Sequence, residues 1–244
     1  MKAVMYGAGN IGRGFIAKRF YLSKMHTVFI DINTKLVEQL NAAGRYPIYE
    51  TRGDGYVAEW VENALAINGR EAEAVAEAIA TADIMATSLG VNVLPHVAPL
   101  IASGIELRYR RGGKPLNILI CENLIGAEAH LRGLVGRFIP EELKSYFEEQ
   151  IGFVSASICI TVPPTPETFL AENPLAVCTD AYRELPVDLD AFRPKGAEPP
   201  KIDGMVARSP FSFFIERKLL IHNMGHALMA YLGWQKKINL ISDI

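Results

Sequence analysis

The chain has 244 residues, half of them hydrophobic, and its 25 basic and 27 acidic residues leave a formal net charge of −2. The charges are interspersed, so neither nucleic acid nor an anionic membrane surface is an expected partner. No uncharged apolar run reaches the length of a membrane-spanning helix, and the first residues lead straight into a strand without a signal peptide, which suits a cytoplasmic protein.

Three cysteines, Cys121, Cys159 and Cys178, lie in or beside apolar runs. None has metal-ligand spacing, and so small and odd a number favours a reducing compartment over a disulfide scaffold. We expect each to be a buried and inert thiol, and we expect no metal site.

The pattern of apolar residues predicts strands that alternate with helices along most of the chain. This alternation is typical of an α/β fold of Rossmann type, with a doubly wound and mainly parallel sheet. A β excursion around "RGDG" is predicted as a hairpin attached to that sheet, and the proline-rich residues 185–210 as a connection. In chain order, we expect a strand at 2–6, a helix at 10–23, a strand at 26–32, a helix at 34–43, the hairpin at 46–68, a helix at 71–81, a strand and turn at 82–90, a helix at 91–102, a strand at 116–123, helices at 124–138 and 141–150, a strand at 152–164, and a helix at 216–233.

The first predicted strand runs into the sequence "GAGNIGRG", which precedes a helix. Gly7 would allow a tight turn, Gly9 would let the backbone approach a pyrophosphate, and Gly12 would let helix and strand pack closely. The free N–H groups and positive dipole end of the helix would face the phosphates. An ordinary glycine turn is the alternative. The predicted dinucleotide-binding residues here are Gly7, Ala8, Gly9, Asn10, Ile11, Gly12, Arg13 and Gly14.

Asp31 ends the second predicted strand, where a carboxylate can accept hydrogen bonds from the adenosine ribose. A carboxylate would also repel the 2′-phosphate of NADP, so Asp31 favours NAD as the cofactor. The alternative is a helix-capping aspartate. Arg13 lies near the right place for an anion, although a solvated or pyrophosphate-side arginine fits the sequence equally well.

Two later strand ends belong to the same edge, because ligands of such sheets lie at the carboxyl ends of the strands. Ser88, Leu89 and Gly90 follow one strand, and Glu122 and Asn123 end another. We expect all five to line the cofactor. Asn123 could reach the nicotinamide, cap the following helix, or do both.

The segment "ERKLLIHNMGHALMAYLG" predicts an amphipathic helix with three polar residues on one side. At about 100° per residue, His226 lies at about 80° and Asn223 at about 140° from Lys218, opposite an apolar stripe. A lysine held in a partly apolar site has a lowered pKa and can accept a proton from an alcohol. Asn223 and His226 could then donate hydrogen bonds to the alkoxide or orient the lysine. A solvated helix face is the alternative.

These segments, together with "LGVNVLPHVAPLI" and "CENLIGA", resemble the mannitol-1-phosphate 5-dehydrogenase branch of the long-chain polyol dehydrogenase family. The resemblance covers residues 1 to about 233. It implies NAD-dependent interconversion of mannitol 1-phosphate and fructose 6-phosphate, with Lys218 as a metal-independent general base and with Asn223 and His226 as oxyanion and orienting groups. A hexuronate or free-polyol reductase of the same family is the nearest alternative.

The chain departs from this family in two respects. Cys159 and Ile160 stand where members typically carry an Asp-Arg pair before two prolines, and members are usually much longer. The resemblance therefore implies an NAD-binding domain at 1–190, followed at 191–244 by a linker and the first part of a helical substrate domain. An uncovered apolar helix face would favour self-association or a partner. A non-catalytic dinucleotide-binding relative is the alternative from another class.

Overall fold

A computed structural model describes residues 1–243 and contains a six-stranded sheet in which every neighbouring pair is parallel. The strand order β5-β2-β1-β6-β7-β8 reverses direction of winding at β1, as in a doubly wound sheet. This confirms the predicted Rossmann-type α/β fold. The strands are β1 (Lys2–Tyr6), β2 (His26–Asp31), β5 (Ala64–Asn68), β6 (Ile84–Thr87), β7 (Leu116–Ile120) and β8 (Ile151–Ser155).

Two hydrophobic cores cover the two faces of this sheet. Along β1, Ala3 and Met5 face one core while Val4 and Tyr6 face the other, which is the two-residue period of a strand. Helix α1 packs in the first core, and α3 to α6 pack in the second. The helices around the sheet are a π-helical turn (Gly12–Ile16) continued by α1 (Ala17–Leu22), then α2 (Thr34–Ala43), α3 (Ala72–Ala80), α4 (Leu94–Arg110), α5 (Ala127–Gly136) and α6 (Lys144–Gln150).

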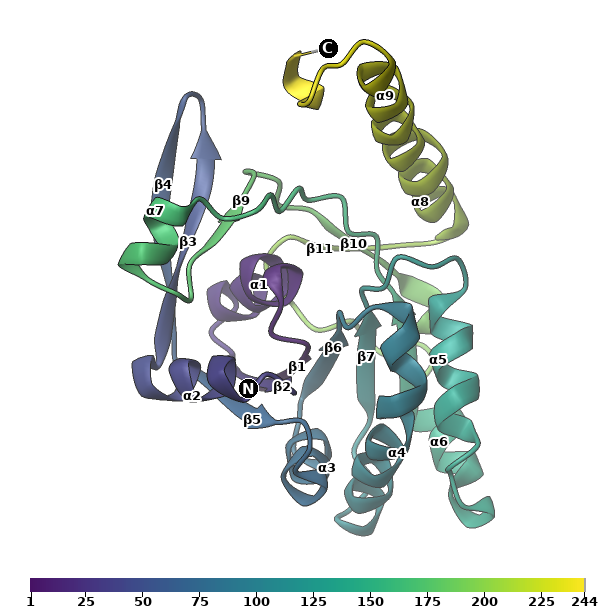
Figure 1. The fold of residues 1–244 in the computed structure, drawn as a ribbon. Coiled ribbons are helices and arrows are strands. Elements are labelled where there is room, and N and C mark those ends of the chain that lie inside the picture. Colours follow the sequence, from purple (N-terminus) through teal and green to yellow (C-terminus); the bar gives the residue numbers. More distant parts are fainter. Residues whose placement is uncertain (244) are drawn as a thin grey trace.

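The predicted hairpin is present as β3 (Arg45–Arg52) and β4 (Gly55–Glu62), but it belongs to a separate sheet. Its third strand is β9 (Val177–Thr179), which pairs with β3 in parallel. Only the end of the predicted excursion, β5, joins the main sheet. In Figure 1 the hairpin rises as an arm beside the main sheet, with α7 (Glu167–Glu172) next to it.

Several predicted bounds were wrong. The strand expected at 152–164 stops at Ser155, and Ala156 then forms an isolated antiparallel bridge with Val187 in place of a continued ladder with β7. The expected connection 185–210 contains a parallel strand pair, β10 (Leu185–Asp188) and β11 (Met205–Arg208). The helix expected at 91–102 begins with a short 3-10 turn and extends to Arg110, with Pro99 inside it.

The last long helix is continuous from Ser212 to Gln235 and consists of α8 (Ser212–Glu216), a π-helical turn (Arg217–Asn223) and α9 (Met224–Gln235). Its base is held by the buried Phe211 and by the Ser157 hydroxyl, which donates to the Phe214 carbonyl at 3.4 Å. The rest of the helix stands apart from the sheet (Figure 1). Its predicted apolar stripe is exposed at Leu220, Ile221, Met224, Leu228, Tyr231 and Leu232.

The helices of residues 1–243 include none that is both long and apolar enough to cross a bilayer. The division into domains at residue 190 stays a prediction.

Candidate active site

The glycine turn between β1 and the first helix is fixed by close packing. Gly7 has a φ of +103°, and a Cβ there would lie 2.3 Å from the Ser88 carbonyl oxygen. A Cβ on Gly12 would lie 2.1 Å from the Gly7 carbonyl oxygen. By contrast, nothing lies within 4 Å of the corresponding position on Gly9. The turn is therefore closed on the protein side and open at Gly9, where a ligand backbone could approach.

Gly14 has a different reason to be glycine. A Cβ there would lie 2.8 Å from Val177 Cγ1 and 2.9 Å from Thr179 Cγ2. Contact with β9 therefore accounts for Gly14, which is buried, whereas Gly9 and Asn10 are exposed at the mouth of the turn and Ile11 is half-buried beside them.

Arg13 is buried beneath this turn, so its interpretation as a solvated arginine was wrong. The Arg13 Nη1 donates to the Ala8 carbonyl, and the Arg13 backbone carbonyl accepts from the Tyr46 hydroxyl at 2.9 Å. Burial lowers the pKa of the guanidinium, partly offset by Tyr46 and Asp31. Its Nε has no hydrogen-bond partner among the described residues. Arg13 thus braces the turn from inside and brings positive charge close to it.

Asp31 lies beside the turn at the end of β2. Its Oδ2 accepts from the Ala8 N–H at 2.8 Å and its Oδ1 from the Asn33 N–H at 2.9 Å. Asn33, rather than Asp31, caps α2, because its side chain accepts from the Leu36 N–H. The structure therefore excludes the helix-capping alternative and keeps the carboxylate at the turn, half-exposed.

The loop after β6 is held by Glu122. Its two carboxylate oxygens accept from the Leu89 N–H at 3.0 Å and the Gly90 N–H at 2.8 Å, while the Ser88 N–H donates to the Tyr6 carbonyl. Glu122 therefore fixes the adjacent loop through a bidentate contact that the sequence did not predict.

Asn123 joins this strand edge to the last helix, 95 residues away. Lys218 Nζ donates to Asn123 Oδ1 at 2.5 Å, and Asn223 Nδ2 donates to the same oxygen at 3.3 Å. Asn123 is not a helix cap, since α5 begins after Gly126 in a left-handed conformation. Two of the three predicted catalytic residues therefore meet at an amide oxygen that follows β7, at the same carboxyl edge of the sheet as the glycine turn after β1.

His226 does not join them. Its ring is exposed and contacts the His222 ring edge-to-face, with 4.5 Å between centroids. The reason is the π-helical turn at Arg217–Asn223, in which hydrogen bonds run from residue i to i+5. That spacing stacks Asn223 above Lys218, whereas the ordinary 100° step predicts His226 as the nearer residue. Such turns are frequent at functional sites.

Lys218 lines a hollow of about 470 Å³ that also contains Cys159 and Tyr182, neither of them predicted as site residues. Burial lowers the pKa of the Lys218 amine, and the charge of Cys159 acts in the opposite direction. Burial, reinforced by His226 and Lys218, lowers the pKa of His222. The complete lining is Cys159, Tyr182, Glu184, Arg217, Lys218, Ile221 and His222.

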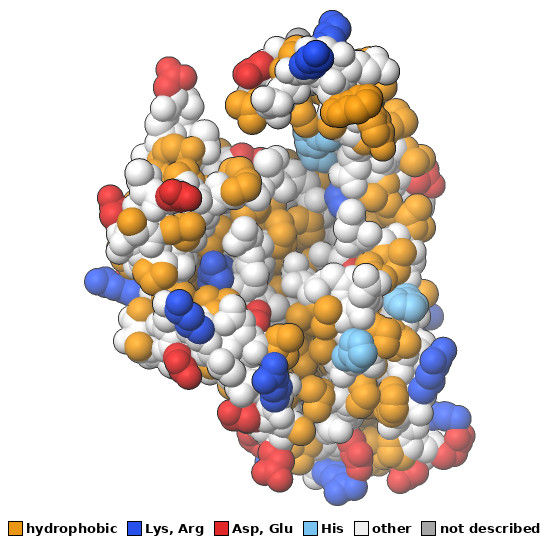
Figure 2. Space-filling model, viewed as in Figure 1, with side chains coloured by type: hydrophobic (Ala, Val, Ile, Leu, Met, Phe, Trp, Pro, Cys, Tyr) orange, Lys and Arg blue, Asp and Glu red, His pale blue; other side chains and the backbone are white. Residues whose placement is uncertain are grey.

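The three cysteines differ in their exposure to solvent. Cys121 and Cys178 are buried as predicted, and burial raises the pKa of both thiols. Cys159 is partly exposed and lines the same hollow as Lys218, so the prediction that it is buried was wrong. Figure 2 shows the face hollowed between the hairpin arm and the last helix.

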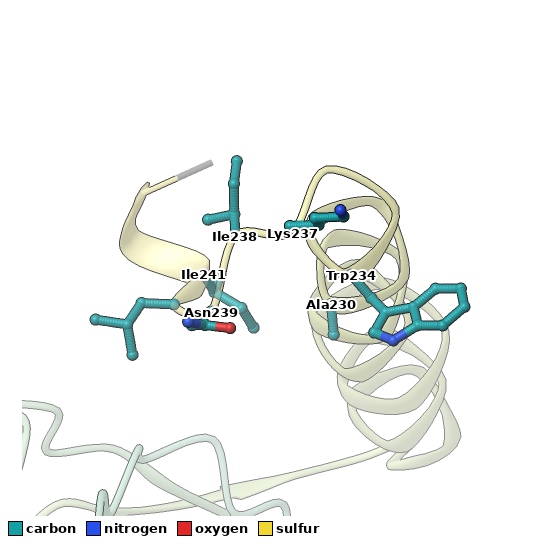
Figure 3. A pocket seen from close by; sticks show the side chains of 8 residues that line it. Ala230, Trp234, Lys237, Ile238, Asn239 and Ile241 are labelled. Carbon is teal, nitrogen blue, oxygen red and sulfur yellow. The ribbon is translucent and has the colours of Figure 1, made fainter.

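A second hollow lies at the far end of the last helix, where the chain turns back (Figure 3). Trp234 points away from that turn, and Lys237 is its only charged lining residue within the described part of the chain. With no acid, histidine or predicted site residue, this hollow is not a candidate active site. It is lined by Ala230, Gly233, Trp234, Lys237, Ile238, Asn239, Leu240 and Ile241.

Solved structures with a similar fold include a D-sorbitol dehydrogenase in substrate-free form, with a TM-score of 0.76, 17% identity and coverage of 95% of this chain and 58% of that one. Another is a Pseudomonas fluorescens mannitol 2-dehydrogenase in a ternary complex with NAD and D-mannitol, with a TM-score of 0.77, 14% identity and coverage of 98% and 59%. At these identities the likeness establishes the fold.

Sequence relatives are closer. Mannitol-1-phosphate 5-dehydrogenases of Brevibacillus brevis and Geobacillus thermodenitrificans are each 37% identical to this chain over 243 and 244 residues. The matches cover 100% of this chain but only 61% of the length of either relative. Residues 1–201 match the family model described as the mannitol dehydrogenase Rossmann domain. The chain therefore belongs to the mannitol dehydrogenase family through its Rossmann domain.

Proposed function

We propose that this protein takes part in the NAD-dependent interconversion of mannitol 1-phosphate and fructose 6-phosphate, with Lys218 as the general base. One observation carries the proposal: the Lys218 amine and the Asn223 amide converge on Asn123, at the same carboxyl edge of the sheet as the glycine turn. The names of the two sequence relatives support the choice of substrate.

The residues of the turn fit a dinucleotide. The open position at Gly9 leaves room for a pyrophosphate, and the first N–H groups of the helix at Asn10 and Ile11 would face it. Asp31 would accept hydrogen bonds from the adenosine ribose, and its charge disfavours the extra phosphate of NADP. When bound, NAD accepts a hydride from the carbinol carbon of the substrate.

Lys218 would take the hydroxyl proton during oxidation. Burial lowers the pKa of its amine, so a larger fraction is neutral and basic at a given pH. Asn123 accepts hydrogen bonds from the amine and from the Asn223 amide. The Asn223 amide would donate a further hydrogen bond to the developing alkoxide. In the reverse direction the protonated Lys218 returns the proton to the carbonyl oxygen.

A substrate panel tests this function. Purified protein is assayed with NAD and NADP on mannitol 1-phosphate, free polyols and hexonates, alongside Lys218→Ala. We expect NAD-dependent turnover of mannitol 1-phosphate, lowered by at least about 100-fold in the variant because a general base is lost. Turnover confined to hexonates or free polyols would favour the alternative reductases. NAD binding without any turnover would favour a non-catalytic protein, and unchanged turnover of the variant would refute the role of Lys218.

A further inference from the structure

Arg217 presents a guanidinium group without a protein partner to the hollow that contains Lys218. Within residues 1–243 its guanidinium makes no hydrogen bond and no ion pair, and it lies over the Phe214 ring, 5.2 Å from the guanidinium carbon to the centroid. The side chain is half-buried. An arginine held against an aromatic ring is pre-oriented and still offers its N–H groups to a ligand.

The surroundings of Arg217 contain a second hydrogen-bond donor. Tyr182 lines the same hollow, and burial raises the pKa of its hydroxyl, so the phenol stays protonated at neutral pH. The charge of Arg217 acts on Tyr182 in the opposite direction, which indicates that the two groups are close. A guanidinium fork and a phenolic O–H together suit the oxygens of a phosphate ester.

We propose that Arg217 and Tyr182 form the subsite for the phosphate group of the substrate and so select phosphorylated over free polyols. This inference rests on the proposed function and names the residues that give it its substrate class. Arg217 and Lys218 are consecutive on the helix and line one hollow. A linear polyol with its reacting hydroxyl at Lys218 therefore has its phosphate-bearing end within reach of the long Arg217 side chain.

Glu184 opposes this subsite. It lines the same hollow, and Asp180 lies near enough to affect the pKa of both Tyr182 and His222. A carboxylate repels a phosphate dianion, so Glu184 weakens binding of the phosphate. The attraction between Arg217 and the phosphate must exceed this repulsion. Substitutions that remove the charge of Arg217 and of Glu184 should therefore change the preference for mannitol 1-phosphate over mannitol in opposite directions.

The test measures kcat/KM with NAD for mannitol 1-phosphate and for mannitol, together with the equilibrium affinity for each, in Arg217→Met, Arg217→Lys and Glu184→Gln. Met keeps the aliphatic stem over Phe214, and Lys keeps the charge without the fork. Lys237→Ala, which removes a cation at the other end of the helix, is the matched control. NAD affinity and thermal unfolding are measured for every variant.

We expect Arg217→Met to lower the preference for mannitol 1-phosphate by roughly 10- to 100-fold, the factor that a charge-assisted hydrogen bond contributes. Arg217→Lys should restore part of that preference, Glu184→Gln should increase it, and Lys237→Ala should leave it unchanged. Equal losses on both substrates in Arg217→Met, or an unchanged preference, would overturn the phosphate assignment while NAD-dependent turnover of mannitol 1-phosphate persisted. A wild-type chain that binds no NAD would instead refute the proposed function.

Discussion

The glycine turn and the last helix contribute opposite sides of the candidate site, and they are built differently. The turn is closed by backbone contacts at Gly7 and Gly12 and braced by the buried Arg13. The helix is attached at its base, exposes its apolar stripe, and is tied to the sheet edge mainly through Asn123. The side predicted to bind the nucleotide is therefore ordered by packing within this chain, whereas the side predicted to be catalytic depends on a few polar contacts.

The largest effect should come from Asn123, the residue that connects the two sides. Asn123→Ala should lower kcat by about 100-fold, because Lys218 and Asn223 lose their shared acceptor. Asn123→Asp should instead move the midpoint of the rise in the oxidation pH–rate profile upward by about one pH unit or more, because a carboxylate favours the charged amine. A structural role alone would predict lower thermal stability in both variants and an unshifted profile.

The packed position in the glycine turn, Gly12, and its open position, Gly9, can be distinguished by adding a single methyl group to each. Gly12→Ala should reduce the free energy of unfolding by about 1–3 kcal/mol, because the new Cβ meets the Gly7 carbonyl. Gly9→Ala should leave the unfolding free energy within about 0.5 kcal/mol of wild type, and it should weaken NAD binding. Denaturant unfolding measures the stability of each variant, and NAD titration measures its affinity for the cofactor. A loss of stability in Gly9→Ala would contradict an open turn.

Asp31→Asn keeps an acceptor for the Ala8 N–H and removes the charge. We expect the preference for NAD over NADP to fall by about 10-fold, equivalent to about 1.4 kcal/mol of lost repulsion and ribose binding. Affinities for the two nucleotides, measured side by side, test this expectation. An unchanged ratio would show that some other group sets cofactor choice.

The smallest effect should come from the exposed stripe. Leu228→Glu should change the free energy of unfolding by less than about 0.5 kcal/mol, because Leu228 is 55% exposed. Leu119→Ala, at a fully buried position, is the contrast and should cost about 2–5 kcal/mol. A large loss in Leu228→Glu, or a change in its sedimentation, would mean that another surface covers this stripe in solution.

The sequence was most informative where local rules govern the structure. Strand, turn and helix around Gly7, Gly9 and Gly12 follow from glycine spacing and apolar period, and the placement of Asp31 follows from them. The sequence was less informative where contacts between distant segments determine the local structure. The extended run after Ser155 has strong β propensity but lacks a partner strand, so it leaves the sheet.

The candidate site shows the same limit. Lys218 and Asn223 were predicted from their positions on one helix, but a uniform helical step could not anticipate the π-helical turn that brings them together and leaves His226 apart. Nor could the sequence indicate that Asn123 accepts from both, since 95 residues separate it from Lys218. The spacing of Lys218 and Asn223, five residues apart, was the one available signal.

The most direct test of the central claim is the pH dependence of kcat/KM for NAD-dependent oxidation of mannitol 1-phosphate, in wild type and in Lys218→Ala with added primary amines. Oxidation needs the neutral amine, so the wild-type rate should rise with pH to a plateau, with a midpoint below the usual lysine value because burial lowers the pKa of Lys218. Lys218→Ala should lose this rise and recover activity with small amines. A variant that keeps the wild-type profile would contradict Lys218 as the base.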